Sequence, residues 1–568
     1  MPDTAFLDNK SSLGLASHLN FSYEEMPTSD LPTELWLEIL SYLPKGASRK
    51  LLGVNRVFFE LALQNIYEEL RLISGDRETM KSLSQLRYPD IVKRVRRIYI
   101  RPASLPKPSD EQEVTRNDRF WSKSRKEKRM SGRPQAIHNS YEHPLYSICS
   151  LDTFLRAAME ATRACTNLEE LTIVLHDQIA TPAFMTFVKA LWSGDSIGRC
   201  FRRLSISTTV AKIPLLLGSL IKPTKNLPNF RELVLDISLS QSAHTELDWI
   251  LAAQRVGSFT RIYKDTITSL SIFSMAFKDT LGKLFTELPY FPALKKFELL
   301  AVLNPQTFAN RELITKFIAS HASTLETLII SPRPPSSSLN VSTYNLYRQW
   351  LVSEDPRTSP HEALFSSLVL PKLHTFQVCV TKTDYQFDTY FPVQADLSYP
   401  PLLPQFFRIT PTLTKLIMTE EENIKHDELS QIIDLLPTHE GTVLLEELTF
   451  ACNTLSCTIL DMLAKRLPRL TSLTITFGVT ASNSEYYDPW SGHIAVQEFA
   501  LVMQTRSYHA WPVRYLRLMK RSSCREGHPS EETMRVVASC ISPNVLLDTA
   551  WTCTCTAMDS RDEAFHWP

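Results

Sequence analysis

The chain has 568 residues, in which 61 lysines and arginines balance 61 aspartates and glutamates, so its formal net charge is zero. This length is too great for one compact hydrophobic core, because such cores stop growing near ~250 to 300 residues. The zero net charge excludes a global field that would steer the protein to nucleic acid or to an anionic membrane. We therefore expect protein partners, no nucleic acid and no membrane.

The first twenty residues lack a basic segment followed by an apolar one, which predicts that the protein is not secreted. Apolar runs such as IPLLLGSLI at 213–221 are too short to cross a bilayer. These features predict a cytoplasmic and/or nuclear protein, and they predict that its ten cysteines are reduced thiols rather than a disulfide framework.

Ordered structure is predicted to begin after a polar tail at 1–27, with a short helix over the run LPTELWLEILSYL at 31–43. At 100° per residue its apolar side chains cover an arc of about 220°, whereas a helix on one core needs a stripe of about 100°. A second apolar face therefore remains to be covered, either by this chain or by another protein.

A second helix is predicted in RKLLGVNRVFFELALQNIYEEL at 49–70, and the whole run at 31–62 resembles the F-box. The resemblance implies docking on a Skp-type adaptor and, through it, on a cullin-based ubiquitin ligase. The run departs from the family at Ala47 and Ser48 and at Asn55 and Phe58. The alternative is a helical hairpin that caps the chain's own repeats. The residues that the resemblance places at the adaptor are Leu31, Pro32, Leu35, Ile39, Leu40, Leu43, Val54 and Phe58.

The remainder of the chain repeats the pattern apolar-x-x-Leu-x-apolar, and a candidate earlier copy begins at Val95. Successive copies are separated by 25 residues (Leu445 to Leu470) to 48 residues (Leu325 to Leu373). The eleven copies begin at Leu168, Phe201, Phe230, Ile267, Leu294, Leu325, Leu373, Leu413, Leu445, Leu470 and Val513.

Each copy alternates apolar with other residues, as a strand with one buried face does, and helix-like runs lie between the copies. Eleven strand–helix units exceed the eight of a closed barrel, which favours an open solenoid. LAKRLPRLTSLTI at 463–475 resembles a leucine-rich repeat of the long helical kind, without the asparagine usual past the strand. The predicted fold is α/β: a helical F-box, then an irregular leucine-rich-repeat solenoid with parallel strands on the concave side and helices outside.

The sequence predicts six segments and two insertions. The first insertion contains a basic run, SKSRKEKRMSGR at 122–133, that we interpret as a solvated loop, with a nuclear-import signal or an RNA-binding patch as alternatives. The second begins at Ser331, in the longest interval between copies. The segments are a tail at 1–27, an F-box-like domain at 28–70, a connector and possible first repeat at 71–100, a charged insertion at 101–142, the solenoid at 143–530 and a C-terminal cap at 531–568.

Residue patterns of known enzyme chemistry are absent from the sequence. Its 14 glycines form no phosphate-binding loop or nucleophile elbow, and no HExxH motif occurs. The pair Cys553 and Cys555 is spaced too tightly for zinc, which favours two or more residues between paired cysteines. We expect no enzyme activity, no metal and no cofactor.

The expected function is that of a non-catalytic substrate-recognition adaptor, whose concave face holds an unknown target protein. The fifth and seventh positions of each copy point to that face, and only three of these twenty-two residues are charged. A neutral surface favours apolar contact that depends little on salt, and the predicted anchors are Phe273, Leu300, Ile329 and Ile417. The alternatives are a leucine-rich-repeat scaffold acting outside ubiquitination and an α/β enzyme with an unfamiliar site.

Overall fold

The computed structural model divides the chain into two compact units, Met1–Tyr67 (unit 1) and Glu68–Pro568 (unit 2). It describes residues 32–42, 56–73, 75–101, 151–176, 180–221, 226–238, 245–275, 281–303, 308, 310–332, 350, 368–378, 410–418, 424, 426–481, 492–522, 531–548 and 551–553. Most of the charged insertion at 101–142 and most of the second insertion lie outside these residues.

Unit 1 contains two helices, α1 (Thr33–Ser41) and α2 (Arg56–Tyr67). The α1 helix starts at Pro32, whose carbonyl oxygen accepts the amides of Leu35 and Trp36 at 3.0 and 3.3 Å. Proline suits this place because a first-turn amide has no partner within its helix. The Trp36 ring meets Phe58 of α2 edge-on, with ring centroids 5.2 Å apart.

Unit 2 is built on a parallel sheet of fifteen strands, in which the strands from β1 to β16 follow one another in chain order, each in register with the next. The last strand, β17, pairs with β15 beyond the end of β16. A short antiparallel hairpin, β11 (Thr438–His439) and β12 (Thr442–Val443), is separate from this sheet and turns at Glu440 and Gly441, both with positive φ. The sheet strands are β1 (Glu69–Leu72), β2 (Arg97–Ile100), β3 (Glu170–Leu175), β4 (Arg203–Thr209), β5 (Glu232–Ser238), β6 (Ser269–Ser274), β7 (Lys296–Ala301), β8 (Thr327–Pro332), β9 (Thr375–Val378), β10 (Lys415–Met418), β13 (Glu447–Ser456), β14 (Ser472–Ala481), β15 (Tyr515–Ser522), β16 (Leu546–Asp548) and β17 (Trp551–Cys553).

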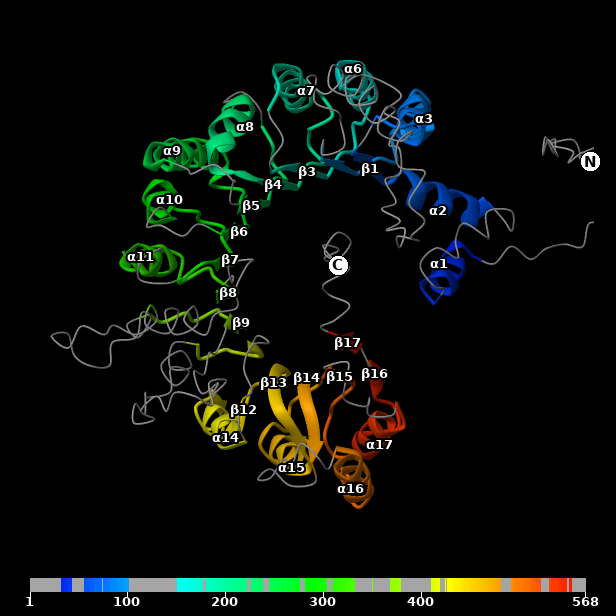
Figure 1. The fold of residues 1–568 in the computed structure, drawn as a ribbon, viewed down its shortest axis with the longest axis vertical. Coiled ribbons are helices and arrows are strands. Elements are labelled where there is room, and N and C mark those ends of the chain that lie inside the picture. The colour runs from blue at the N-terminus through cyan, green and yellow to red at the C-terminus, as the bar shows by residue number, and fades with distance from the viewer. Residues whose placement is uncertain are drawn as a thin grey trace, which may run out of the picture. The chain divides into compact units, whose positions relative to one another are not determined.

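Helices cover the outer side of this sheet and leave the strands on the inner side (Figure 1). Several begin at a side-chain cap, for example the capping box in which Thr245 and Asp248 bond each other's backbone amides. The helices are α3 (Arg77–Gln85), α4 (Pro89–Val92), α6 (Leu151–Thr162), α7 (Pro182–Ser193), α8 (Ile213–Leu220), α9 (Glu246–Tyr263), α10 (Leu281–Glu287), α11 (Glu312–Ser320), α14 (His426–Asp434), α15 (Cys457–Arg466), α16 (Gly492–Gln504) and α17 (Glu531–Ile541), with a 3-10 turn at Val210–Lys212 before α8.

The predicted fold class is confirmed, because the eleven sequence copies are the strands β3 to β10 and β13 to β15. The candidate earlier copy at Val95 leads into β2. The sheet also extends beyond the predicted solenoid range of 143–530. It begins at β1, and β16 and β17 add to it within the segment expected to be a cap, because backbone pairing continues where the side-chain pattern does not.

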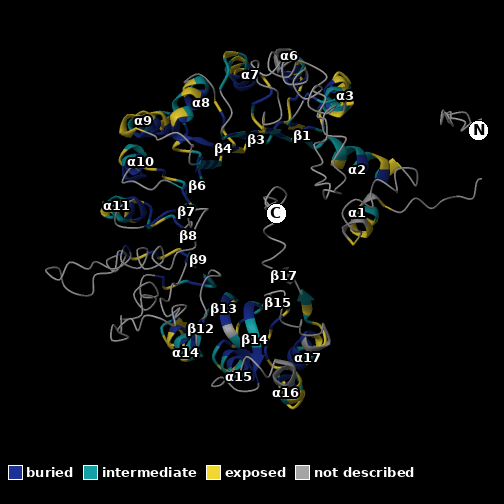
Figure 2. Ribbon diagram, viewed as in Figure 1, coloured by how far each residue is buried: buried dark blue, intermediate teal, exposed yellow. Residues whose placement is uncertain are grey.

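The core lies between the sheet and the helices, and buried residues occur on both (Figure 2). It takes the first, fourth and sixth residue of every copy. Phe201 and Phe230 hold the first position in adjacent repeats and stack with centroids 5.7 Å apart. Trp192, Phe259 and Tyr263 extend this cluster at centroid distances of 5.1 to 5.9 Å. The same position in consecutive copies therefore forms one continuous apolar column.

Helices α9 and α10 approach so closely that only glycine fits at one contact. A Cβ at Gly257 of α9 would lie 2.6 Å from the carbonyl oxygen of Glu287, the last residue of α10. By contrast, a Cβ at Gly218 of α8 would meet nothing within 4 Å.

We predict that Gly257→Ala lowers the free energy of unfolding by about 1 to 3 kcal/mol, because the overpacking exceeds the gain in helix propensity. Gly218→Ala is the matched control and should be neutral or stabilising by up to about 1 kcal/mol. Thermal unfolding followed by circular dichroism compares the two variants, and equal midpoints would contradict the close α9–α10 contact.

His321, just after α11, is completely buried and acts as a polar link inside the core. Its Nε2 accepts the backbone amide of Phe291 at 2.9 Å, and its Nδ1 lies 2.7 Å from the carbonyl oxygen of Phe317. These contacts select the neutral ring with the proton on Nδ1. Burial lowers the pKa of His321, although the bond to Phe317 opposes the shift.

We predict that His321 makes unit 2 less stable in mild acid. Because the folded-state pKa is lowered, the unfolded chain takes up the proton first, so stability is lost as the pH falls below about 6.5. The difference in unfolding midpoint between wild type and His321→Asn should therefore be larger at pH 7.5 than at pH 5.5. His374→Asn, at an exposed position, is the control. Parallel pH profiles for wild type and His321→Asn would rule out this role.

Candidate protein-interaction surfaces

Unit 1 exposes apolar side chains on α1. Leu35 and Ile39, one turn apart, are 44% and 41% exposed, and Tyr42 beyond the helix end is 79% exposed. Trp36 turns instead toward α2. The helix thus presents one apolar stripe to its partner helix and a second stripe to solvent.

The eight residues predicted to contact the adaptor fall into three groups. Pro32, Leu35 and Ile39 are exposed. Phe58 is 3% exposed because it packs against Trp36, so it supports this surface from within and is not part of it. The others lie outside the described residues or, for Leu40, have a side chain that the structure does not describe.

On unit 2, the strict register of the sheet sorts the inner side chains into rows. We name three of them: the edge row holds the third position of each copy, the middle row the fifth and the far row the seventh. Neighbouring members belong to adjacent strands, about 4.8 Å apart. Each row therefore crosses the sheet at right angles to the chain direction of the strands.

The edge row is charged, which the sequence interpretation of the inner face did not include. Its first five members alternate in sign, and ion pairs within it join Arg97 to Glu69 at 3.7 Å and Arg203 to Glu232 at 3.8 Å. The sequence signal was present as acidic and basic residues alternating between consecutive copies. The row runs Glu69, Arg97, Glu170, Arg203, Glu232, Ser269, Lys296, Thr327, Thr375, Lys415, Glu447, Ser472, Tyr515 and Leu546.

Three of the four predicted target anchors lie on adjacent strands. Phe273 of β6 is the register partner of Leu300 of β7, and Ile329 lies on the next strand, β8. Ile417 is apart from them, because Gln377 of β9 stands between Ile329 and Ile417 in the middle row. The role of all four residues in target binding stays a prediction.

Small polar residues are recessed between these larger side chains. Ser271 and Ser331 are 4% and 7% exposed, whereas Phe273 and Leu300 are half-buried. Ser271 donates its hydroxyl to Glu298 at 2.9 Å, and Glu298 is also paired with Lys296 at 3.2 Å. Among the residues that the structure describes, the hydroxyl of Ser331 has no hydrogen-bond partner.

A histidine–serine–aspartate cluster lies at the carboxyl ends of β3, β4 and β5. Ser207 donates to Asp236 at 2.6 Å, and His176 Nε2 lies 3.5 Å from the same hydroxyl. His176 Nδ1, the nitrogen that a triad carboxylate would orient, lies 2.9 Å from Ser238 Oγ. This arrangement suits a hydrogen-bond network that links three strands better than it suits a catalytic relay.

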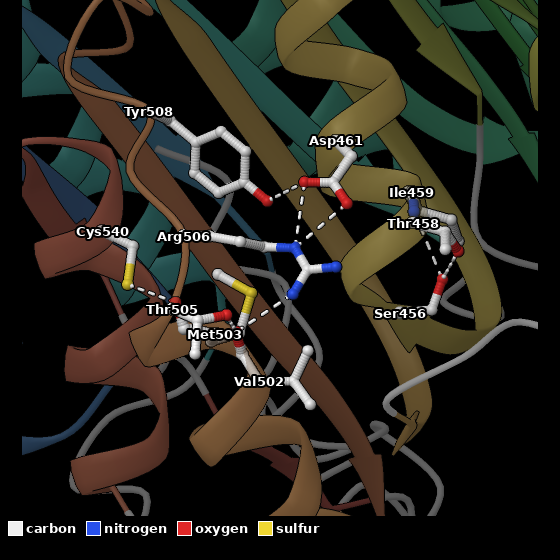
Figure 3. A network of polar contacts seen from close by, with 10 residues as sticks. All are labelled: Ser456, Thr458, Ile459, Asp461, Val502, Met503, Thr505, Arg506, Tyr508 and Cys540. Carbon is white, nitrogen blue, oxygen red and sulfur yellow. Dashed lines mark hydrogen bonds and ion pairs between the residues drawn. The ribbon is translucent and has the colours of Figure 1, made fainter.

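A second polar network joins the last repeats on the outer side (Figure 3). Asp461 of α15 accepts two bonds from Arg506 Nε, at 3.1 and 3.0 Å, and one from the Tyr508 hydroxyl at 2.5 Å. Burial, together with this bond, raises the pKa of Tyr508. From α17, the Cys540 thiol donates to the Met503 carbonyl at 3.1 Å. The network ties α15, α16 and α17 together.

Neither a metal site nor a membrane span is found in the part of the chain that the structure describes. There, no three His, Cys, Asp or Glu side chains converge as metal ligands would. None of the helices in the same residues combines the length and the apolar character needed to cross a bilayer.

We predict that Asp461→Ala loosens the C-terminal repeats. The change leaves the half-buried Arg506 without its carboxylate, at a cost of about 1 to 2 kcal/mol. Hydrogen exchange should accelerate in α15 to α17 and stay unchanged in β3 to β7. Glu312→Ala, which removes the exposed ion pair with Lys316, is the control and should cost less than about 0.5 kcal/mol. If Asp461→Ala changed the hydrogen-exchange rates uniformly throughout unit 2, the network would not be a local contact between the C-terminal repeats.

Comparison with known proteins gives no family assignment: no family model and no curated protein sequence matches this chain. Among solved structures, it is similar to a chain of the yeast Rad7–Elc1 complex, with 12% identity, 78% of this chain and 98% of that chain covered, and a TM-score of 0.29. It is also similar to a Bacteroides fragilis protein, with 11% identity, 66% and 78% covered, and a TM-score of 0.21. At these scores the likenesses carry no weight in the functional argument.

Proposed function

We propose that this protein is a non-catalytic substrate-recognition adaptor of a cullin-based ubiquitin ligase. Unit 1 binds a Skp-type adaptor, and the inner face of unit 2 binds a target protein. The observation that supports this best is the exposure of Leu35 and Ile39 within a run that resembles the F-box. These two apolar side chains stand at positions where that family docks.

The exposed surface of Leu35 and Ile39 supplies part of the free energy that binding a partner requires. Fully burying a leucine or isoleucine yields roughly 1.5 to 3 kcal/mol. Leu35 and Ile39 keep about two-fifths of their surface exposed, so covering them recovers only part of that free energy. Association costs about 4 to 15 kcal/mol, so the remainder of the segment at 31–62 has to contribute as well.

The proposed contribution to ubiquitination is proximity. When unit 2 holds a target and unit 1 holds the ligase, the effective concentration of the target near the ligase is high. This effect needs no catalytic group in this chain. The hydrogen-bond pattern around His176 supports this non-catalytic role, since its Nδ1 faces a serine hydroxyl.

We predict that Leu35→Asp with Ile39→Asp weakens binding to a purified Skp-type adaptor at least tenfold, because both charges would have to be desolvated at the interface. Leu247→Asp with Leu251→Asp is the matched control on α9, where two leucines with the same spacing are 60% and 41% exposed. Calorimetry on the full chain measures both. Leu31→Ala with Leu43→Asp, outside the described residues, should also abolish binding.

Two outcomes would reject this assignment. One is that wild type binds no Skp-type adaptor, in which case a leucine-rich-repeat scaffold outside ubiquitination becomes the better description. The other is that both double variants weaken binding equally. Circular dichroism shows that each variant is folded before it is scored.

A further inference from the structure

The residues that come just before the edge row form a further row, which we name the start row. It holds the second position of each copy, at the amino-terminal ends of the strands. Its first five members are Glu68, Arg96, Glu169, Arg202 and Arg231. From Arg96 onward, the backbone amide of each member bonds the carbonyl oxygen of the member before it at 2.7 to 2.9 Å, so consecutive members are neighbours. Their charges alternate in sign as far as Arg202, and Arg231 breaks the alternation.

Two like charges therefore meet at Arg202 and Arg231, whose backbones are about 4.8 Å apart. Glu169, on the other side of Arg202, lies 3.2 Å from Arg96 and 3.9 Å from Arg202. Among the residues that the structure describes, Arg231 forms no ion pair, and Thr268, the next member of the row, is uncharged. Like charges opposite each other on neighbouring strands are destabilising, so an anion bound between them would relieve the repulsion.

A third arginine, Arg199, lies in the turn before β4. Asn229, in the turn before β5, donates its side-chain amide to the carbonyl oxygen of Arg199 at 2.6 Å, so the two turns are in contact. The strands that they lead into are neighbours in the sheet (Figure 1). Arg199 and Arg231 are exposed, and the side chain of Arg202 is 65% exposed. A partner can therefore reach all three side chains at the amino-terminal edge of the sheet.

The spacing of these arginines suits carboxylates on a protein chain. A guanidinium group binds one carboxylate with two parallel hydrogen bonds, and each arginine offers such a group separately. Successive residues of an extended chain are about 3.4 Å apart, and residues two positions apart are about 7 Å apart. The strand spacing of about 4.8 Å lies between these values. Closely spaced aspartates or glutamates can therefore pair with neighbouring arginines.

The surroundings of the three arginines disfavour a long polyanion such as nucleic acid. Glu169 precedes β3 on one side, Glu232 lies at the start of β5, and Asp265 is exposed in the turn before β6. A nucleic acid strand carries a phosphate at every nucleotide, so it would meet these carboxylates on either side of the arginines. A short segment with two or three negative charges avoids them.

We propose that Arg199, Arg202 and Arg231 form a docking surface for a short acidic segment of a partner protein, with closely spaced aspartates or glutamates. This surface adds an electrostatic contact at the amino-terminal ends of β4 and β5 to the apolar contacts expected on the inner face. It does not depend on the ligase assignment, because adaptor binding by unit 1 is measured separately with the variants of α1.

The test uses the purified full chain and a displayed library of random twelve-residue peptides. We expect enrichment of peptides in which two or more aspartates or glutamates lie within three consecutive residues. One enriched peptide and its version with asparagine and glutamine in place of the acidic residues are then titrated by fluorescence anisotropy. The neutral version should bind at least tenfold more weakly. Raising the salt from about 50 to about 200 mM should weaken the acidic peptide about threefold to tenfold, because exposed charges are screened.

The double variant Arg202→Gln with Arg231→Gln should lose the enrichment and bind the acidic peptide at least tenfold more weakly. Arg163→Gln with Arg469→Gln is the matched control, because it removes the same charge at two exposed arginines of other repeats. This control should bind as wild type does. Circular dichroism shows that both double variants are folded before they are compared.

Three results would overturn the proposal. The first is no enrichment of acidic peptides by wild type. The second is an equal loss of binding in the two double variants, which would make the effect one of net charge alone. The third is competition by single-stranded oligothymidine that equals competition by the acidic peptide at the same concentration of negative charge, which would assign the surface to nucleic acid.

Discussion

Unit 2 depends on the burial of the first, fourth and sixth residue of every repeat beneath the outer helices. This burial fixes which face of each strand is inside, because a slip of one residue would turn all the core side chains to solvent. With the face fixed, in-register hydrogen bonding aligns equivalent positions of successive copies. The buried column of Phe201 and Phe230 and the inner rows both follow from this alignment.

The inner rows differ in how many charged side chains they contain and in whether these charges are paired. In the edge row, Arg97 with Glu69 and Arg203 with Glu232 neutralise each other across strands, so the row presents little net field. The middle and far rows carry few charges, and they mix apolar residues such as Phe273, Leu300 and Ile329 with buried serines such as Ser271 and Ser331. Such a surface offers a partner shape and local polar contacts and little long-range attraction, which fits recognition of a protein segment.

In unit 1, large apolar side chains are exposed as well as buried. Its two described helices have nine and twelve residues, too few to cover each other's apolar sides. Trp36 and Phe58 use one side of the pair, and Leu35 and Ile39 remain on the other. A partner that covered Leu35 and Ile39 would therefore stabilise unit 1, whereas the repeats of unit 2 stabilise one another through nearest-neighbour contacts.

The sequence by itself determined the eleven strands that the copies form, their buried positions and the fold class. A period-two pattern and a helix-like run are local features of consecutive residues, so they can be recognised without the tertiary structure. It also placed Phe273, Leu300 and Ile329 on the inner face. Only the tertiary structure decided their neighbours: the grouping of these three, the separation of Ile417 by Gln377, and the Asp461–Arg506 contact. Each depends on register or packing between residues about 25 to 50 positions apart, which irregular repeat lengths conceal from a local pattern. β1 and β16 escaped prediction for a related reason, since backbone pairing with a formed sheet holds them without a strong pattern of their own.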